Sequence, residues 1–406
     1  MDSNLRPKLR LLEPTAGNAG GHEGIGLSDP RGLFEGTVFV PSGLIPLLQR
    51  FTGEATVSEI AADLSAISGA EVSIDIVAEV VADLDQRLCL EGERFDRAVE
   101  AQRKELDVLQ AWPAVLAGSA GYPADSGQCV ARLDQIVGAV PATSTDAPRM
   151  VGVIAPHIDL ARGEHGYKAA YAALAAAPVS DLYVLFGTAH KGPERLLVPT
   201  RKDFVTPLGT VSTDGDFVDA VAQTLGEDPY REEYLHLREH SVAFQALFLQ
   251  HLAGDRPIRI APFLTGCLPD NPQDSAEVTE LVEAITGAVR SFDGSVTFVG
   301  GADMAHMGPF FGDAEPVADE LLTTVEQLDR HSLELLEQRE LGAFFEDIEG
   351  DGNPRRICGT VPMYLVARLT KELAPDCRAE LLDYGQAPAG DGSQVVTFAS
   401  MAFRDG

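Results

Sequence analysis

Three stretches of the chain each lead from an apolar run into a histidine or a carboxylate. Residues 150–157 read MVGVIAPH, residues 182–190 read LYVLFGTAH, and residues 296–306 read VTFVGGADMAH. A short apolar run without polar interruption is typical of a strand that is buried on both faces of a sheet. We therefore expect three buried strands whose polar ends lie at the same edge of one sheet.

The segments around these strands repeat the same alternation. Further strand-like runs lie at 258–263 and 395–398, and helical patterns lie at 167–176, 216–225, 241–252, 276–289 and 316–336. Strands and helices that take turns predict an α/β fold with a mainly parallel sheet and helices on both faces. In such sheets ligands bind beyond the carboxyl ends of the strands, because helix N-termini point their N–H groups inward there.

The polar residues at these strand ends are candidate pocket residues. A single histidine after a strand is more often a surface or capping residue than a ligand. His157, His190 and His306 all follow apolar strands, although the chain has only nine histidines, and this is a poor fit to random scatter. Asp303 follows the third strand and is expected to lie beside them.

Cys358 is the fourth candidate, in the sequence Arg355-Arg356-Ile357-Cys358 before a helix predicted at 363–369. We predict Thr360 as the cap of that helix, with Pro362 in its first turn. A helix N-terminus and upstream arginines lower the pKa of a thiol, which favours the thiolate that binds a metal or attacks an electrophile. The remaining cysteines are expected to be inert: Cys89, Cys129, Cys267 and Cys377.

Composition narrows the classes of function. The length of 406 residues, with 45% hydrophobic and 23% charged residues, predicts two folded domains or one large domain with an extension. The formal charge of −31 repels phosphate backbones and anionic lipid, so we expect neither nucleic acid nor a membrane surface as a partner.

The five cysteines and the N-terminal sequence indicate the compartment. The cysteines are widely spaced and lack CxxC spacing, which argues against a disulfide framework and fits a reducing environment. No stretch approaches 18 uninterrupted apolar residues, and the first residues lack an export signal. We expect a cytoplasmic protein.

The N-terminal quarter has a different pattern. Residues 1–25 are expected to be a flexible lead-in, and residues 26–97 a small winged-helix module with a capping box at 56–59 and a hairpin or wing at 89–95. A connecting helix is predicted at 98–111, and the α/β domain occupies 112–406.

The predicted third helix of the module, at 73–88, is acidic. It carries Asp75, Glu79, Asp83 and Asp85 against the single Arg87. A DNA-binding winged helix remains the alternative, but this charge is wrong for a recognition helix. The module resembles the PqqD-like, peptide-recognising winged helices of radical-SAM maturation systems, and a role in protein contact is favoured.

Residues 112–406 resemble the Memo family, the B component of the AmmeMemoRadiSam grouping. The motifs that carry this resemblance are, in chain order, AVLAG at 114–118, YPAD at 122–125, APH at 155–157, FGTAH at 186–190, FVTPLG at 204–209, EHS at 239–241, DMAH at 303–306 and ICG at 357–359. The resemblance implies a fold similar to the extradiol-type (class III) non-haem iron dioxygenases.

The resemblance also implies a set of site residues. The metal ligands would be His157, His190 and Cys358, and the catalytic groups around them would be His240, His306 and Asp303. Either of the two catalytic histidines would be the general base, oriented by Asp303. Two departures from the family pattern are residues 158–163, which read IDLARG, and Ala243, which stands where a glutamate is usual.

Three functions follow as alternatives. The first is a metal-dependent redox enzyme, with Fe(II) favoured over zinc or copper. It would act with a radical-SAM protein and an AMMECR-like protein, on a peptide or protein substrate presented by the winged helix. The second is a non-catalytic metal- or peptide-binding adaptor that retains the pocket. The third is a hydrolase or transferase with Cys358 as the nucleophile.

Overall fold

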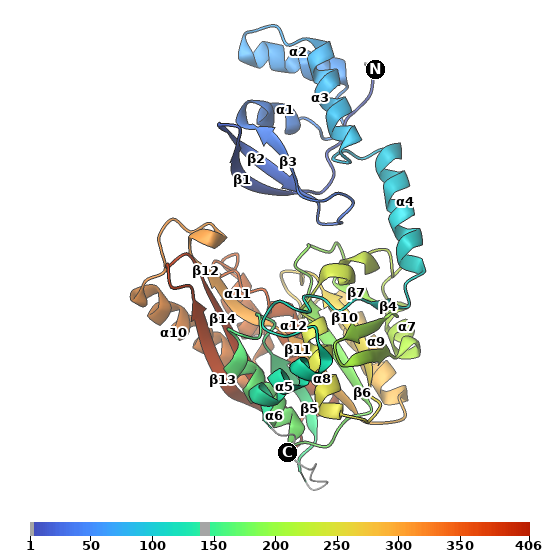
Figure 1. Cartoon of the computed structure of the whole chain (residues 1–406), viewed down its shortest axis with the longest axis vertical. Coiled ribbons are helices and arrows are strands. Elements are labelled where there is room, and N and C mark those ends of the chain that lie inside the picture. Colours follow the sequence, from blue (N-terminus) through green and yellow to red (C-terminus); the bar gives the residue numbers. More distant parts are fainter. Residues whose placement is uncertain (1–3, 139–146) are drawn as a thin grey trace. The chain divides into compact units, whose positions relative to one another are not determined.

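The computed structural model describes residues 4–138 and 147–406, which form two compact units, Met1–Leu109 and Gln110–Gly406. Figure 1 labels their helices and strands. Within the described ranges, no helix combines the length and the apolar character that crossing a membrane requires.

The N-terminal unit begins with a small antiparallel sheet. Its strands are β1 (Glu13–Ala19), β2 (His22–Ser28) and β3 (Thr37–Pro41), in that order across the sheet. Gly20 and Gly21 join the first two strands with φ angles of 60° and 83°, a conformation that glycine adopts without strain. A hairpin thus stands where a loose lead-in was expected, while residues 1–3 lie outside the described residues.

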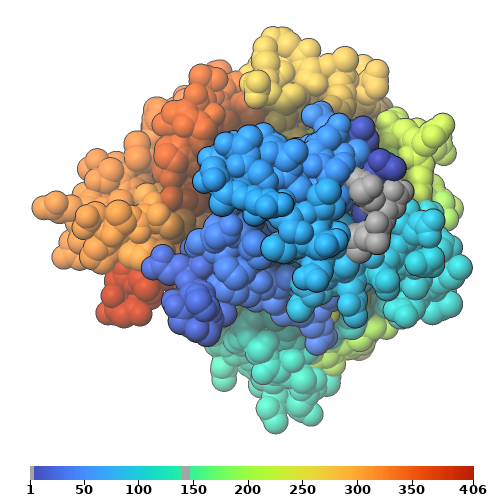
Figure 2. Space-filling model, turned by 90° about the horizontal axis from the view of Figure 1, so that it is seen from above, coloured from blue at the N-terminus to red at the C-terminus, as the bar shows by residue number. Residues whose placement is uncertain are grey.

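Four helices follow: α1 (Ile45–Leu48, after the short 3-10 helix η1 at Ser42–Leu44), α2 (Val57–Ser68), α3 (Ile74–Gln86) and α4 (Glu93–Asp107). The predicted capping box is present at α2, where Thr56 and Glu59 bond reciprocally. The sheet and helices α1, α2 and α3 share one apolar core, and Figure 2 shows them side by side in dark and lighter blue. The wing expected at 89–95 is absent: Leu90 bridges Leu9, and α4 begins at Glu93.

The second unit is built on a sheet of eleven strands. The strands are β4 (Ala111–Trp112), β5 (Met150–Ala155), β6 (Leu182–Thr188), β7 (Leu197–Pro199), β8 (Asp203–Thr206), β9 (Gly209–Thr213), β10 (Arg259–Thr265), β11 (Val296–Gly301), β12 (Asp303–Met307), β13 (Arg378–Pro388) and β14 (Val395–Arg404). Their main order is β12-β14-β5-β11-β6-β10-β9-β8-β4, with β13 paired to β14 and β7 to β10.

The centre of this sheet is parallel and its margin is not. Strands β5, β11, β6 and β10 run parallel, which places the carboxyl ends of the first three side by side. Strand β14 runs antiparallel to β5, β12 and β13, so the sheet is mixed. The prediction of an α/β fold with a mostly parallel sheet is therefore confirmed for β5, β6 and β11, whereas β12, which carries Asp303 and His306, is antiparallel to its neighbour.

Helices cover both faces of the sheet. One layer contains α5 (Ser126–Val137), α6 (Glu164–Ala175) and α8 (Ala243–Ala253); the other contains α7 (Gly215–Ala222), α9 (Ala276–Ser291), α10 (Asp319–Glu337), α11 (Leu341–Glu349) and α12 (Thr360–Leu373). The short 3-10 helices η2 (Glu233–Arg238) and η3 (Pro309–Phe311) lie in loops.

Two adjacent glycines at the end of β11 show how close these layers approach the sheet. A Cβ on Gly300 would lie 3.2 Å from the Val366 side chain of α12. A Cβ on Gly301 would lie 2.3 Å from the carbonyl oxygen of Ser241, just before α8, on the opposite face. Glycine is required at the second position because a backbone atom occupies the space of a side chain.

Candidate metal centre

His157 lies directly beyond β5 and is almost fully buried. Its Nδ1 lies 2.9 Å from the carbonyl oxygen of Gly301 at the end of β11. Because a carbonyl only accepts, Nδ1 carries the hydrogen, and the lone pair of Nε2 is left for the pocket. The backbone N–H of His157 donates to Asp303 Oδ1 at 2.9 Å, which fixes the turn after the strand.

His190 follows β6 and is oriented by Glu239. Its Nδ1 lies 3.0 Å from Glu239 Oε2, and its backbone N–H donates to the same oxygen at 3.0 Å. The other oxygen of Glu239 accepts the N–H groups of His240 at 2.8 Å and of Ser241 at 3.0 Å. One buried carboxylate therefore holds the two segments that carry His190 and His240.

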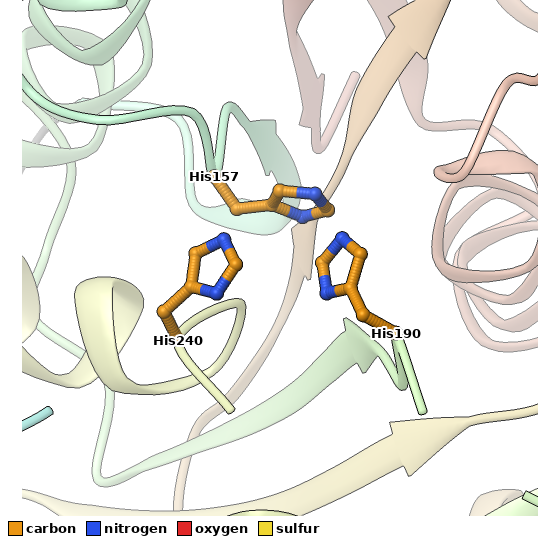
Figure 3. Close-up of side chains that lie close together, drawn as sticks. All are labelled: His157, His190 and His240. Carbon is orange, nitrogen blue, oxygen red and sulfur yellow. The ribbon is translucent and has the colours of Figure 1, made fainter. Parts of the chain in front are cut away.

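The rings of His157, His190 and His240 converge, as Figure 3 shows. One ligand nitrogen from each ring lies within 4.8 Å of the others, so the three could hold a metal ion. The side chain of His157 is buried, whereas those of His190 and His240 are 33% and 29% exposed. The group is therefore open to solvent on one side and closed on the other.

Cys358 lies against the same group. Its Sγ is 3.3 Å from His157 Nε2, and its carbonyl oxygen accepts the hydroxyl hydrogen of Thr188 at 2.8 Å. Bonds of about 2.0 Å to nitrogen and 2.3 Å to sulfur put two ligands of one metal roughly 3.1–3.5 Å apart at angles near 90–110°. The Cys358–His157 spacing fits a shared metal.

The helix that follows Cys358 begins differently from the prediction. Gly359 is the N-cap of α12 and no side chain caps it, so Thr360 is not the cap. The Thr360 hydroxyl instead donates backwards to the carbonyl oxygen of Ile357 at 3.2 Å. Any side chain at the cap position would clash with β12, since even a Cβ on Gly359 would lie 2.4 Å from the Asp303 carbonyl oxygen.

The charges of the pocket favour a thiolate beside an imidazolium when no metal is bound. Burial alone raises the pKa of Cys358, but His157 and His190 outweigh it and lower the pKa to about 5. Burial likewise lowers the pKa of His157, while Asp303 and Cys358 outweigh it and raise the pKa to about 9. Metal ligation needs this thiolate, and a bound cation would replace the proton on His157.

His190 and His240 differ in their charge. Burial opposes protonation of His190, yet its hydrogen bonds to Cys358 and Glu239 raise its pKa to about 11. Burial and the neighbouring His157 lower the pKa of His240 to about 4, so this ring is neutral near pH 7. As a neutral, partly exposed imidazole within the group of three, His240 can accept a proton.

Asp303 and His306 lie on β12, which the sequence pattern did not predict as a strand. Asp303 Oδ2 is 3.6 Å from His157 Nε2, so the carboxylate borders the ligand group. His306 is half-buried; its Nδ1 lies 3.1 Å from the Met304 carbonyl oxygen and its ring packs against Phe311. His306 therefore lies beside the pocket rather than in the group of three histidines.

Sequence reasoning missed Glu239 as a functional residue. It directly precedes His240 in the motif at 239–241, and that adjacency was the available signal. Ala243, where the family resemblance implied a glutamate, begins α8 and is half-buried. The pocket thus keeps the carboxylates of Glu239 and Asp303 without one at position 243.

Comparisons with known proteins assign the second unit to a family. The family described as Memo-like protein matches residues 113–402. A MEMO1 family protein of Aquifex aeolicus is 22% identical over 401 residues, which cover 98% of this chain and 100% of that protein. A MEMO1 family protein of Thermococcus kodakarensis is 27% identical over 300 residues, which cover 72% of this chain and 99% of that protein. One of Thermus thermophilus is 27% identical over 321 residues, covering 77% of this chain and 92% of that protein.

The match to the Aquifex protein extends over almost the whole chain, so the N-terminal unit has a counterpart in that relative. The family match is confined to the second unit and contains every residue of the candidate metal centre. The chain therefore belongs to the Memo-like (MEMO1) family.

Proposed function

We propose that the chain is a metal-dependent redox enzyme whose metal is held by His157, His190 and Cys358, with Fe(II) favoured. The observation that carries the proposal is that Cys358 Sγ lies 3.3 Å from His157 Nε2, beside a group in which one ring nitrogen each from His157, His190 and His240 lies within 4.8 Å of the others. Two imidazoles and one anionic ligand leave coordination positions free, as catalytic sites do.

The residues present fit a metal of this kind. The Nδ1 atoms of His157 and His190 are engaged by Gly301 and Glu239, which leaves both Nε2 atoms as donors. Such partners on the far side of a ligand orient the ring and raise its basicity. Bound Fe(II) would supply positions for dioxygen and substrate, whereas zinc or copper would be held by the same ligands.

His240 is proposed as the proton acceptor of the reaction. It is neutral near pH 7 and partly exposed, and its ring centroid lies 5.5 Å from that of His157. Its position among the three histidines also makes it the alternative third ligand. Asp303, whose Oδ2 lies 3.6 Å from His157 Nε2, would help to balance the positive charge of the bound metal.

The first test is the metal content of the protein purified without oxygen, measured by elemental analysis. We expect one transition metal per chain in the wild type and in Cys267→Ser, whose cysteine is exposed. Cys358→Ser should lose the metal. Retention of one full equivalent by Cys358→Ser, together with loss in His240→Ala, would show that the three histidines form the site without the thiol.

The second test concerns turnover. An extract that contains the substrate is first freed of metal ions. The Fe(II)-loaded wild type should consume dioxygen when this extract is added. His240→Ala should keep its iron but should no longer consume dioxygen. Iron binding without any oxygen consumption or redox change would leave a metal-binding adaptor as the better description.

A second candidate function rests on the contact between Cys358 and His157. A thiolate 3.3 Å from an imidazole is the arrangement of a cysteine nucleophile and its base, as in hydrolases and acyl transferases. Alkylation by iodoacetamide separates the two functions. A metal centre predicts that Fe(II) or Zn²⁺ protects Cys358 from the reagent, whereas a free nucleophile reacts equally fast with and without metal.

We further propose that the enzyme acts with a radical-SAM protein and an AMMECR-like protein, which the family resemblance supports. The N-terminal unit would present a peptide or protein substrate. Within the described residues, β3 pairs only with β2, and a cavity of about 230 Å³ lies beside it. Apolar residues of β3 and α3 line the cavity together with Glu79 and Asp83, which suits an extended basic peptide.

Substitution on α3 tests this partner. Glu79→Lys should weaken binding of a basic peptide to the purified chain, whereas Glu71→Lys, outside the cavity lining, should not. Equal binding by both variants would remove the cavity from the proposal and leave the metal centre unaffected.

A further inference from the structure

A buried ion pair lies behind the loop that carries Cys358. Arg355 Nη1 donates to Asp329 Oδ1 at 2.9 Å, and the two side chains are 7% and 0% exposed. Nη2 of Arg355 also donates to Ser332 Oγ at 2.9 Å and to Asp347 Oδ2 at 3.2 Å. The pair joins α10, which contains Asp329, to the residues directly before Cys358.

Asp329 also reaches the strand that carries Asp303 and His306. Its Oδ2 accepts the hydroxyl hydrogen of Thr397 on β14 at 2.5 Å. Thr397 Oγ1 in turn accepts the backbone N–H of Ala305 on β12 at 2.8 Å. This contact lies where the register of β12 against β14 shifts, so a side chain replaces a backbone bond of the ladder.

The loop and the strand are joined directly on both sides of Cys358. The backbone N–H of His306 donates to the Arg355 carbonyl oxygen at 2.8 Å, and that of Gly359 donates to the Asp303 carbonyl oxygen at 3.0 Å. Cys358 lies between these two bonds. A shift of either end therefore moves Sγ relative to His157.

Stability alone does not account for the pair. Burying two charges is costly, and an apolar pair of similar volume often gives equal or greater stability. What charged groups add is directional bonding: an arginine fork and a carboxylate fix their neighbours more tightly than methyl groups do.

We infer that Asp329 and Arg355 are positioning residues that hold Cys358 and His306 in place against the three histidines. The inference deepens the proposed function, since the pair would tune the metal centre. Its consequence for the geometry of the Cys358 thiol, however, holds with or without a metal.

The experiment compares Asp329→Asn, Arg355→Met and the double variant with Glu334→Gln. Glu334 is a matched control, because it lies on the same helix α10, is exposed, and accepts a hydrogen bond from the Gln338 side chain at 3.1 Å, away from Asp329. The single variants should unfold at lower temperature, since Asp329→Asn leaves Arg355 with the Asp347 carboxylate alone and Arg355→Met leaves the buried Asp329 without its cation. The double variant, which removes both charges, should recover much of that loss.

Two readouts report positioning rather than stability. The first is Co(II) affinity, with the absorption band of the cobalt–thiolate bond; we expect affinity to fall about 10–100-fold in all three variants, including the double. The second uses metal-free protein and measures the iodoacetamide rate of Cys358 relative to that of exposed Cys267. This ratio should change in the three variants and stay constant in Glu334→Gln.

The outcomes separate the two claims. A double variant that regains its stability together with wild-type Co(II) affinity and a wild-type rate ratio would overturn the positioning role. Absence of Co(II) binding in the wild type would overturn the metal proposal. The iodoacetamide rate ratio alone would then decide whether Asp329 and Arg355 position Cys358. If the double variant does not fold, Arg355→Lys, which keeps the charge but loses the fork, should still change the ratio; an unchanged ratio would count against the inference.

Discussion

Asp303 touches the main chain of His157 and not the ring nitrogen that carries the hydrogen. Its Oδ1 accepts the backbone N–H of His157, while the ring Nδ1 bonds to Gly301. Asp303→Asn retains an oxygen for the backbone bond but loses the charge beside Nε2. Metal affinity should therefore fall by about tenfold and not vanish, as titration with Co(II) would show. Complete loss of binding would make Asp303 a ligand.

His306 lies beside the pocket, against Phe311. His306→Ala should keep one metal per chain and abolish substrate-dependent activity if the imidazole transfers a proton. Metal stoichiometry, activity and melting temperature, measured on the same preparation, distinguish a proton-transfer group from a packing residue and from a ligand. A lowered melting temperature with full activity would reduce His306 to a packing residue, and loss of the metal would make it a ligand.

At this scale the sequence predicted only part of the group and missed what orients it. The strand-end pattern pointed to His157, His190 and His306, whereas the third ring of the group is that of His240, which was named only through the family resemblance. His157, His190 and Cys358 were recognisable because they end apolar strands or begin a helix. Glu239 was not, because a carboxylate that accepts several backbone N–H groups leaves no periodic signal. Gly301 was missed for a similar reason: its function is to offer a carbonyl oxygen and to leave room for Ser241.

At the scale of the elements, the approach of α8 to the end of β11 is the tightest constraint near the pocket. Gly301→Ala would place a Cβ 2.3 Å from the Ser241 carbonyl oxygen, so the segment that carries His240 must move. We expect a destabilisation of about 1–3 kcal/mol and weaker metal binding, measured by chemical denaturation and Co(II) titration.

Gly287→Ala is the matched control, since a Cβ there meets no atom within 4 Å and Gly287 lies inside α9. It should stabilise the protein by about 0.5–1 kcal/mol, because alanine is the better helix former. Equal effects of the two substitutions would show that the close approach at Gly301 is not a constraint.

The central strands were predicted well, and the run at 395–398 lies within β14, but β12 and the short strands β4, β7, β8 and β9 were not predicted. The apolar run at 150–155 coincides with β5, and the runs at 182–186 and 296–299 lie within β6 and β11. These strands are buried on both faces, so continuous apolar sequence identifies them. Strand β12 reads DMAHM and is half polar, and its pairing with β14 depends on contacts far along the chain.

At the scale of the whole molecule, the two units should respond differently to metal removal. A ligand that binds only the folded state at about 100 times its Kd adds roughly 2.7 kcal/mol. A chelator should therefore lower the unfolding temperature of the second unit and leave that of the first unchanged. The single tryptophan, Trp112, is buried in the second unit, so its fluorescence follows that unit alone.

Calorimetry of the full chain sees both units and supplies the comparison. One transition should move with the tryptophan signal, and another should stay in place. A common shift of all transitions would mean that the units unfold together, and no shift at all would contradict a tightly bound metal.

Glu239 has a consequence for how this pocket can change over generations. Because the rings of His190 and His240 both contact this carboxylate, with their Nδ1 atoms 3.0 Å and 3.3 Å from its oxygens, a substitution at either histidine alters the setting of the other, and their effects on binding will not add. Lineages that abandon the pocket are expected to lose the two histidines and Glu239 as a group. In a chain that keeps only one of His190, His240 and Glu239, the remaining residue would no longer serve the site.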